Sequence, residues 1–171
     1  MGRIDLAIKL LKNLIRDREA LIFVGVGEPL IIAEKYKKLN PKIILCLEAG
    51  AYDFFKKRPD TIGDGRILSC SYKSDTLGIL SFLGRRNVDI AIIGGVQVDY
   101  NGNVNSTLLD RGEYLAGSGG ASDFFNGAKI RIVVIPKNRI VKKVYYKTSV
   151  KADFIVTDSR IIYVVKKKLN F

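Results

Sequence analysis

Glu48 is the residue of this 171-residue chain whose type and position point most directly to chemistry. It follows an apolar run over residues 42–47, and two small residues, Ala49 and Gly50, come next. Small neighbours let a substrate approach closely, and a poorly solvated carboxylate at a strand end can act as a nucleophile. Position alone also fits a solvated acid or a helix cap, which is the commoner role for such a residue.

Two glycine-rich segments are the next candidates. Gly117-Ser-Gly-Gly-Ala121 can turn several backbone N–H groups outward at a helix start, an arrangement that binds anions or an oxyanion. Gly25-Val-Gly27 follows an apolar run but lacks the third glycine and the acidic partner of a dinucleotide-binding fingerprint. Each signal is weak by itself, because most glycine-rich segments only turn the chain.

An amide-rich segment, Asn101-Gly-Asn-Val-Asn-Ser106, follows a glycine pair at Gly94 and Gly95. Asn-Gly is a tight-turn signal. The Asn and Ser side chains can hydrogen-bond a polar substrate, or they can bond only to their own turn. For any one of these residues the second role is at least as common as the first.

The residue types present exclude several mechanisms. The chain has no histidine, so it cannot build a Ser-His-Asp triad, a Cys-His dyad or a histidine zinc site by itself. Cys46 and Cys70 both lie in apolar stretches and are expected to be buried, reduced thiols, so no metal site is predicted. An acid, base or nucleophile must therefore be Asp, Glu, Lys, Tyr, Cys, Ser or Thr.

The net charge of +12 favours polyanionic partners such as nucleic acid, an anionic membrane or a phosphorylated cofactor. The basic residues are spread out apart from Lys166–Lys168, and no RNA-binding motif or zinc finger is present, so a solvated basic surface is favoured over nucleic-acid binding. Charged residues interrupt every apolar run, and residues 4–17 have the spacing of an amphipathic helix rather than of a signal peptide. We therefore expect no membrane contact and a cytoplasmic location.

The elements that must position these residues alternate between strand and helix. Helices are expected over residues 4–17, 29–38 and 76–83 and from 117–120 through 127, and strands over 20–25, 42–47, 66–71, 88–94 and 130–135. Three short β-branched runs, at 141–146, 154–156 and 161–165, are typical of antiparallel hairpins, with a turn at Asp158-Ser159. Continuous apolar strands between helices imply a mainly parallel sheet covered on both faces. We predict one three-layer α/β domain over residues 1–171, with antiparallel C-terminal strands.

The strand ends in this fold bring the candidates together. In open α/β sheets, ligands bind outside the carboxyl ends of the strands. Gly25 ends the first strand, Glu48 follows the second, and residues 94–99 follow the fourth. We expect these ends to converge on one crevice, which the turn at 117–120 can join.

Taken together and in this order, these segments resemble the β subunit of the class I CoA-transferases, closest to the β subunits of the glutaconate CoA-transferase group. Residues 94–106 are similar to the family pattern GGAQxDxxGNVNS, and residues 117–121 to its GSGGA. Residues 47–50, 24–30 and 155–158 resemble its ESG, VGxGxPL and VVTD segments. The resemblance spans nearly the whole chain.

The resemblance implies that Glu48 attacks an acyl-CoA thioester and later carries coenzyme A as a glutamyl thioester, which passes to an acceptor carboxylate. Gly119 and Gly120 are the implied catalytic backbone groups, with the Gly120 N–H as donor to the thioester oxygen. The residues expected to bind substrate or coenzyme A are Gly25, Gly27, Gln97, Asn103, Asn105 and Ser106. Coenzyme A is a substrate and no permanent cofactor is expected. An α-type partner subunit is expected to supply another donor and much of the CoA-binding surface.

Three departures from the family pattern leave the substrate open. Glu28 stands where an apolar residue is usual, Ser122-Asp123 follow the GSGGA segment where Asn is common, and a C-terminal extension of longer members is absent. Related pairs of the same fold hydrolyse a cyclic ketone on a CoA thioester with the key acid on the other subunit, although retention of Glu48 argues against this. A basic, non-catalytic binding module is a third alternative, which leaves the glycine and asparagine motifs unexplained.

Overall fold

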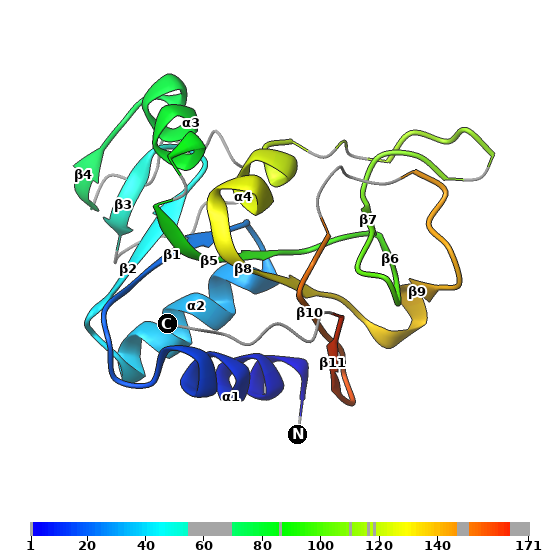
Figure 1. Ribbon diagram of the computed structural model, residues 1–171, viewed down its shortest axis with the longest axis horizontal. Helices are drawn as coiled ribbons and strands as arrows, with labels where there is room; N and C mark the ends of the chain where they lie inside the picture. The colour runs from blue at the N-terminus through cyan, green and yellow to red at the C-terminus, as the bar shows by residue number, and fades with distance from the viewer. Residues whose placement is uncertain are drawn as a thin grey trace.

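The computed structural model describes residues 2–54, 70–85, 87–109, 111–115, 117, 119–146 and 151–164. Its main sheet comprises β1 (Ala20–Val24), β2 (Ile43–Leu47), β3 (Ala51–Phe54), β4 (Cys70–Lys73), β5 (Val88–Ile93), β8 (Ala128–Val134), β10 (Phe154–Val156) and β11 (Ile161–Tyr163). The strand order is β11-β10-β8-β5-β1-β2-β3-β4 (Figure 1).

The centre of the sheet is parallel and its edges are antiparallel. β1 pairs in parallel with β2 and β5, and β8 pairs in parallel with β5 and β10. β1 is a continuous apolar run, and β5 is apolar apart from Asp89, because both faces of these strands are covered. The antiparallel β10–β11 pair confirms the predicted C-terminal hairpin. At the other edge, β3 and β4 add an antiparallel pair that the sequence did not predict.

Two helices cover each face of the sheet, which confirms the predicted three layers (Figure 1). α1 (Arg3–Ile15) and α2 (Glu28–Leu39) lie on one face, and α3 (Thr76–Gly84) and α4 (Ala121–Gly127) on the other. Each face has its own core. Leu11, Ile22 and Leu45 belong to the α1/α2 side, whereas Phe23 and Phe125 belong to the α3/α4 side. Alternate residues of one strand thus fill opposite layers.

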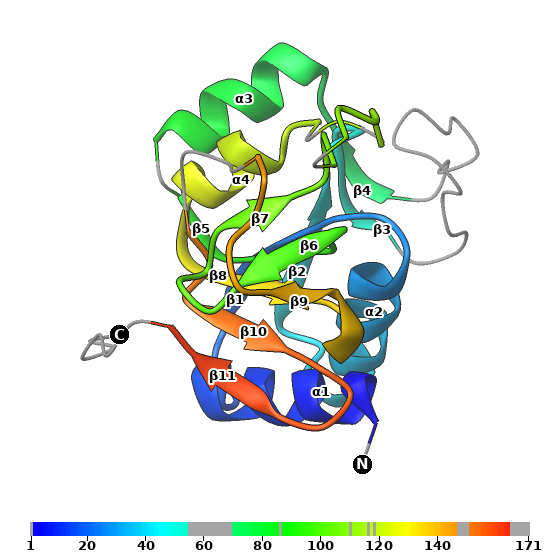
Figure 2. The same cartoon turned by 90° about the vertical axis from the view of Figure 1, so that its right-hand side faces the viewer.

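A second, small sheet corrects two expectations. It contains β6 (Gln97–Asp99), β7 (Val104–Asn105) and β9 (Ile140–Val141), in the order β7-β6-β9 (Figure 2). The amide-rich region after Gly95, for which no strand was predicted, therefore contains two short strands, β6 and β7. The strand predicted over 141–146 is wrong: β9 pairs in parallel with β6 and ends at Val141. Lys142 and Lys143 are both exposed, so the apolar alternation that a hairpin strand requires is lost there.

Most remaining boundaries differ from prediction by one or two residues. Of the strand predicted over 66–71, only Cys70 and Ser71 are among the described residues, where they begin β4. Residues 66–69, Val165 and Lys166–Lys168 lie outside the described residues. Among the helices of the described residues, none is both long and apolar enough to cross a membrane.

Candidate active site

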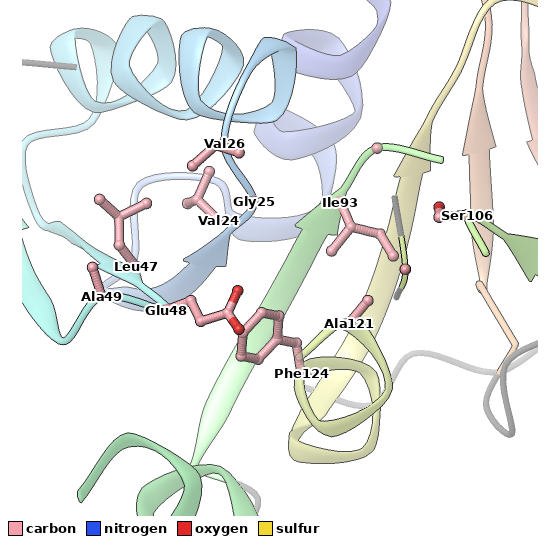
Figure 3. Close-up of a pocket in the computed structure, with 12 residues that line it drawn as sticks. Val24, Gly25, Val26, Leu47, Glu48, Ala49, Ile93, Ser106, Ala121 and Phe124 are labelled. Atoms are coloured by element: carbon pink, nitrogen blue, oxygen red, sulfur yellow. The ribbon is translucent and has the colours of Figure 1, made fainter. Parts of the chain in front are cut away.

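Side chains along β2 alternate between the two faces of the sheet, and this alternation decides where Glu48 points. Leu45 and Leu47 pack in the α1/α2 core, whereas Cys46 packs in the α3/α4 core. Glu48 lies two residues beyond Cys46, so its side chain turns to the same side, toward α4 (Figure 3). The apolar pattern of β2 thus aims the carboxylate into the α3/α4 layer of the molecule.

A tight turn at Gly50 follows β2 and leaves Glu48 directly after the last residue of that strand. Gly50 has a φ of +83°, and its N–H donates to the carbonyl oxygen of Leu47 at 3.0 Å. The carbonyl oxygen of Gly50 accepts from the Ser74 N–H at 2.8 Å, and a Cβ at Gly50 would lie 1.8 Å from the Ser74 carbonyl oxygen. Only glycine fits this turn, which sends the chain back as β3.

The carboxyl ends of β1, β2 and β5 converge on one cavity of about 150 Å³, as the sequence predicted (Figure 3). Its wall is mostly apolar, with the Glu48 carboxylate and the Ser106 hydroxyl as polar side-chain groups. The lining residues are Val24, Gly25, Val26, Leu47, Glu48, Ala49, Ile93, Gly94, Ser106, Gly117, Ala121 and Phe124. A small, largely apolar cavity with few polar groups is typical of a ligand site at the carboxyl ends of such a sheet.

The Glu48 carboxylate is half-buried and has a backbone donor. The Gly120 N–H donates to Glu48 Oε1 at 3.2 Å. Burial raises the pKa of Glu48 above the ordinary glutamate value, the Gly120 bond acts in the opposite direction, and the charge of Asp123 raises the pKa further. A carboxylate with fewer solvating partners is a better nucleophile than a fully hydrated one.

The backbone at Gly120 approaches its neighbours so closely that an added side chain would displace Glu48 or Phe124. A Cβ at Gly120 would lie 2.9 Å from Glu48 Oε1 and 2.7 Å from Phe124 Cζ. Phe124 also stacks on Phe23, with ring centroids 3.8 Å apart, and forms part of the cavity wall. Sequence reasoning missed Phe124, because nothing in the sequence distinguishes it from the adjacent core residue Phe125.

The amide-rich segment bonds mainly to itself. Asp99 is buried and accepts from the N–H of Asn101 and the N–H of Asn103, each at 3.0 Å, and from Asn103 Nδ2 at 2.8 Å. Asn105, also buried, donates to Gln97 Oε1 at 3.0 Å and to the Leu108 carbonyl at 2.6 Å.

The Asn105 Oδ1 atom also accepts from the N–H groups of Thr107 and Leu108. Of the four residues predicted to bind substrate in this segment, Ser106 lies in the cavity wall. Gln97, Asn103 and Asn105 hold the turn that places it.

The other predicted residues divide into two groups. Gly25 is part of the cavity wall. Gly27 is the N-cap of α2, with a φ of +82°, and Gly119 is exposed, with a φ of +49°. Gly27 and Gly119 therefore shape the turns beside the cavity, whereas Gly25 lines it and Gly120 donates to the Glu48 carboxylate in its wall.

The remaining acids and thiols are placed as follows. Glu28 accepts a hydrogen bond from Arg3 Nε at 2.7 Å and is not part of the cavity wall. Asp123 is exposed in the first turn of α4. Cys46 is buried, and burial raises the pKa of its thiol to about 12, so it is not a thiolate nucleophile. Within the described ranges, no group of three or more His, Cys, Asp or Glu side chains could hold a metal ion.

Known proteins are similar to this chain in both sequence and fold. The B subunit of glutaconate CoA-transferase from Acidaminococcus fermentans is 33% identical over 144 residues, which cover 75% of this chain and 53% of that protein. The B subunit of 3-oxoadipate CoA-transferase from Pseudomonas knackmussii is 29% identical over 143 residues, covering 77% and 54%. The chain thus spans about half the length of these two relatives.

A solved structure agrees with the sequence relatives. The crystal structure of glutaconate coenzyme A-transferase from Acidaminococcus fermentans superposes with a TM-score of 0.80 at 25% identity, covering 98% of this chain and 76% of that one. The family described as acetyl-CoA hydrolase/transferase C-terminal domain matches residues 52–167, a range that begins just after Glu48. The resemblance to CoA-transferase β subunits is therefore confirmed, and the chain belongs to the acetyl-CoA hydrolase/transferase C-terminal domain family.

Proposed function

We propose that this chain is the β-type subunit of a heteromeric acyl-CoA:carboxylate CoA-transferase in which Glu48 is the nucleophile. One observation carries the proposal: the half-buried Glu48 carboxylate lies in a small apolar cavity, 3.2 Å from the Gly120 N–H. Family membership and the two relatives support the reaction class. A carboxylate nucleophile divides one difficult exchange into easier steps and needs no histidine, which this chain lacks.

The first half-reaction forms and then opens an anhydride. A Glu48 oxygen attacks the thioester carbonyl carbon, and the C–S bond breaks to release CoA thiolate and leave a mixed anhydride. The thiolate then attacks the Glu48 carbonyl carbon and expels the donor acid as a carboxylate. The product is a Glu48–CoA thioester. The acceptor carboxylate reverses these steps, so Glu48 is regenerated and no net proton is taken up.

The hydrogen bond between Glu48 and Gly120 must change during the first step. In the free chain the Gly120 N–H is donated to Glu48 Oε1. As the Glu48 oxygen bonds to the thioester carbon, its charge passes to the thioester carbonyl oxygen, and the same N–H becomes the donor for that oxygen. A fixed donor that meets charge as it develops lowers the barrier more than one that stabilises the ground state alone.

An α-type partner subunit completes the proposed enzyme. This chain contributes the nucleophile and one backbone donor, while the relatives it matches are B subunits. We expect the partner to supply a second donor and much of the CoA-binding surface, and coenzyme A to act as a substrate with no permanent cofactor. Residues 1–171 as one domain and a cytoplasmic location are further parts of this proposal.

The decisive experiment is covalent labelling of Glu48. The chain is combined with its α-type partner and acetyl-CoA without an acceptor acid, and the intact mass is measured. We expect an adduct of coenzyme A on the peptide that contains Glu48, and borohydride should reduce this thioester to an alcohol at that residue. Normal turnover by a Glu48→Ala variant would exclude the mechanism.

A hydrolase of the same fold is the second candidate, favoured by the matched family's description, which covers both hydrolases and transferases. The two reactions differ in the final acceptor, since water replaces the carboxylate. The two subunits are therefore given acetyl-CoA with and without added glutarate, and both free coenzyme A and glutaryl-CoA are measured. Release of free coenzyme A without glutarate would favour hydrolysis, and formation of glutaryl-CoA would favour transfer.

A further inference from the structure

Arg3, in the first turn of α1, joins two acids that are far apart in the sequence. Its Nε donates to Glu28 Oε2 at 2.7 Å, and its Nη1 donates to Asp158 Oδ1. The Arg3 side chain is 18% exposed, so the guanidinium is largely shielded from water. Figure 2 shows the start of α1 beside the turn between β10 and β11, where Asp158 lies.

Glu28 connects this ion pair to the wall of the Glu48 cavity. It is the first residue of α2, directly after the turn in which Gly25 and Val26 line the cavity. The N-cap of α2 is Gly27, which offers no side-chain cap and has a φ of +82°. At one end of this turn, the Gly25 N–H donates to the Ile92 carbonyl oxygen at 2.9 Å, which ties the turn to β5. At the other end, the turn has no side-chain cap, and the Arg3–Glu28 pair holds the residue that follows it.

The hydrogen bond from Arg3 Nη1 to Asp158 fixes the position of the guanidinium itself. Asp158 also accepts from the backbone N–H of Lys137 at 3.0 Å, through its other oxygen. Lys137 follows β8, and Asp158 follows β10. Arg3 therefore ties the turn after β1 to the ends of two other strands at the same edge of the sheet. Glu28, which is not part of the cavity wall, makes this tie.

We propose that Arg3 is a positioning residue for the Glu48 cavity, acting through Glu28 on the turn over residues 25–27. This inference rests on the proposed function only for its kinetic consequence, because the contacts exist in the free chain. Loss of the pair should let Val26 and Gly27 move and widen the cavity on that side, while Gly25 stays bonded to Ile92. Binding of the acyl-CoA should then weaken, while the chemical step at Glu48 should change little.

The first test needs no substrate. Hydrogen–deuterium exchange of the peptide that covers residues 25–31 is compared among the wild-type chain, Arg3→Met and Lys129→Met. Lys129 is the matched control, because it forms a 2.7 Å pair with Asp89 near the amino ends of β5 and β8, away from the cavity. We expect exchange to rise about two- to fivefold in Arg3→Met alone, the scale of a partly exposed ion pair. Equal exchange in all three proteins would overturn the inference.

The second test separates positioning from general stability. With the α-type partner and acetyl-CoA, Arg3→Met and Glu28→Gln are expected to raise KM about two- to fivefold and to change kcat by less than about twofold. The double variant should resemble Arg3→Met, because Arg3→Met already removes the pair that Glu28→Gln weakens. Lys129→Met should keep the wild-type KM even if its melting temperature falls.

Each outcome has a distinct meaning. Additive effects of Arg3→Met and Glu28→Gln, or an unchanged KM in both, would contradict the positioning role. If Arg3→Met does not fold, Glu28→Gln carries the same test, since it retains Arg3 and its bond to Asp158. If the wild-type chain and its α-type partner form no CoA adduct, the proposed function fails. The hydrogen–deuterium exchange experiment still tests the role of Arg3 in that case.

Discussion

The Glu48 cavity and residues 97–108, which include the amide-rich segment, both carry groups of polar residues, and they use them in opposite ways. Asn105 makes four hydrogen bonds within its own segment and is buried. Glu48 has one backbone donor and faces a cavity. A polar group whose donor and acceptor sites are all used by neighbouring residues supports the structure. A carboxylate that still has acceptor sites can bind or attack a substrate.

This difference gives the largest expected effect at Glu48. Glu48→Gln should reduce CoA exchange by about a thousandfold or more, because the amide is not a nucleophile. The pKa of Glu48 is raised in the folded chain, so the folded state binds its proton more tightly than the unfolded state does. The ionised form at pH 7 therefore lowers stability, and the melting temperature of Glu48→Gln should not fall. Assays of CoA exchange test the predicted loss of activity, and thermal unfolding at pH 7 tests the predicted stability.

The contrast with the amide-rich segment would fail if Glu48→Gln kept wild-type exchange. It would also fail if this variant lost stability as a structural hydrogen-bonding residue does. The Gln side chain keeps an oxygen that can accept from the Gly120 N–H, so a fall in melting temperature could not be attributed to loss of that bond.

The second largest effect is expected at Gly120. Gly120→Ala places a Cβ against Glu48 Oε1 and Phe124 and should slow exchange about ten- to a hundredfold, because donor and nucleophile are both displaced. Gly84→Ala is the matched control, since Gly84 ends α3 with nothing within 4 Å of an added Cβ. Single-turnover measurement of adduct formation distinguishes slower chemistry from weaker binding. Similar rates for the two variants would contradict the role of Gly120.

The third prediction concerns the structural side of the comparison. Asn105→Ala removes four hydrogen bonds from a buried position and should lower the free energy of unfolding by about 2–3 kcal/mol. Exchange activity of the folded fraction should stay within about threefold of wild type. Asn101→Ala, at an exposed side chain, should change stability by less than about 0.5 kcal/mol. Urea unfolding measures both, and a stable but inactive Asn105→Ala would move this residue into the substrate site.

The smallest effect is expected at Asp123. Its charge contributes to the raised pKa of Glu48, so Asp123→Asn should lower that pKa. Because the carboxylate form is the nucleophile, activity rises with pH through this pKa, and the acid limb of the pH–rate profile should move to lower pH. Asp17→Asn, at an exposed position after α1, serves as the control. An acid limb that moves upward, or equally in both variants, would contradict the coupling.

The sequence predicted the central part of this fold because its signals are local. The apolar runs of β1, β2 and β5 identify buried parallel strands, and the carboxyl ends of such strands define one edge of the sheet. The convergence of Gly25, Glu48 and Gly94 on one cavity followed from that rule. The pairing of β3 with β4 was missed because β3 is a four-residue strand without a strong alternating pattern, although the strand predicted over 66–71 overlaps the start of β4.

The roles within the site required the tertiary structure. Glu28 and Asp123 are both acids that lie close in the sequence to residues of the cavity wall. Glu28 nevertheless pairs with Arg3 from another helix, while the charge of Asp123 raises the pKa of Glu48. Asn103 and Asn105 matched the same motif as Ser106, although they bond to their own turn. A motif gives the residue types, but the partners of a side chain depend on contacts between distant segments.

The sequence by itself determined the layers, the family resemblance and the edge of the sheet at which Glu48 lies, because strand periodicity and motif order are properties of the chain alone. The tertiary structure decided that the Gly120 N–H faces Glu48 across 72 residues of chain, that Phe124 lines the cavity and that Arg3 bonds to Glu28. Those three contacts depend on how distant segments pack, and packing at the ångström scale is not encoded in any local pattern.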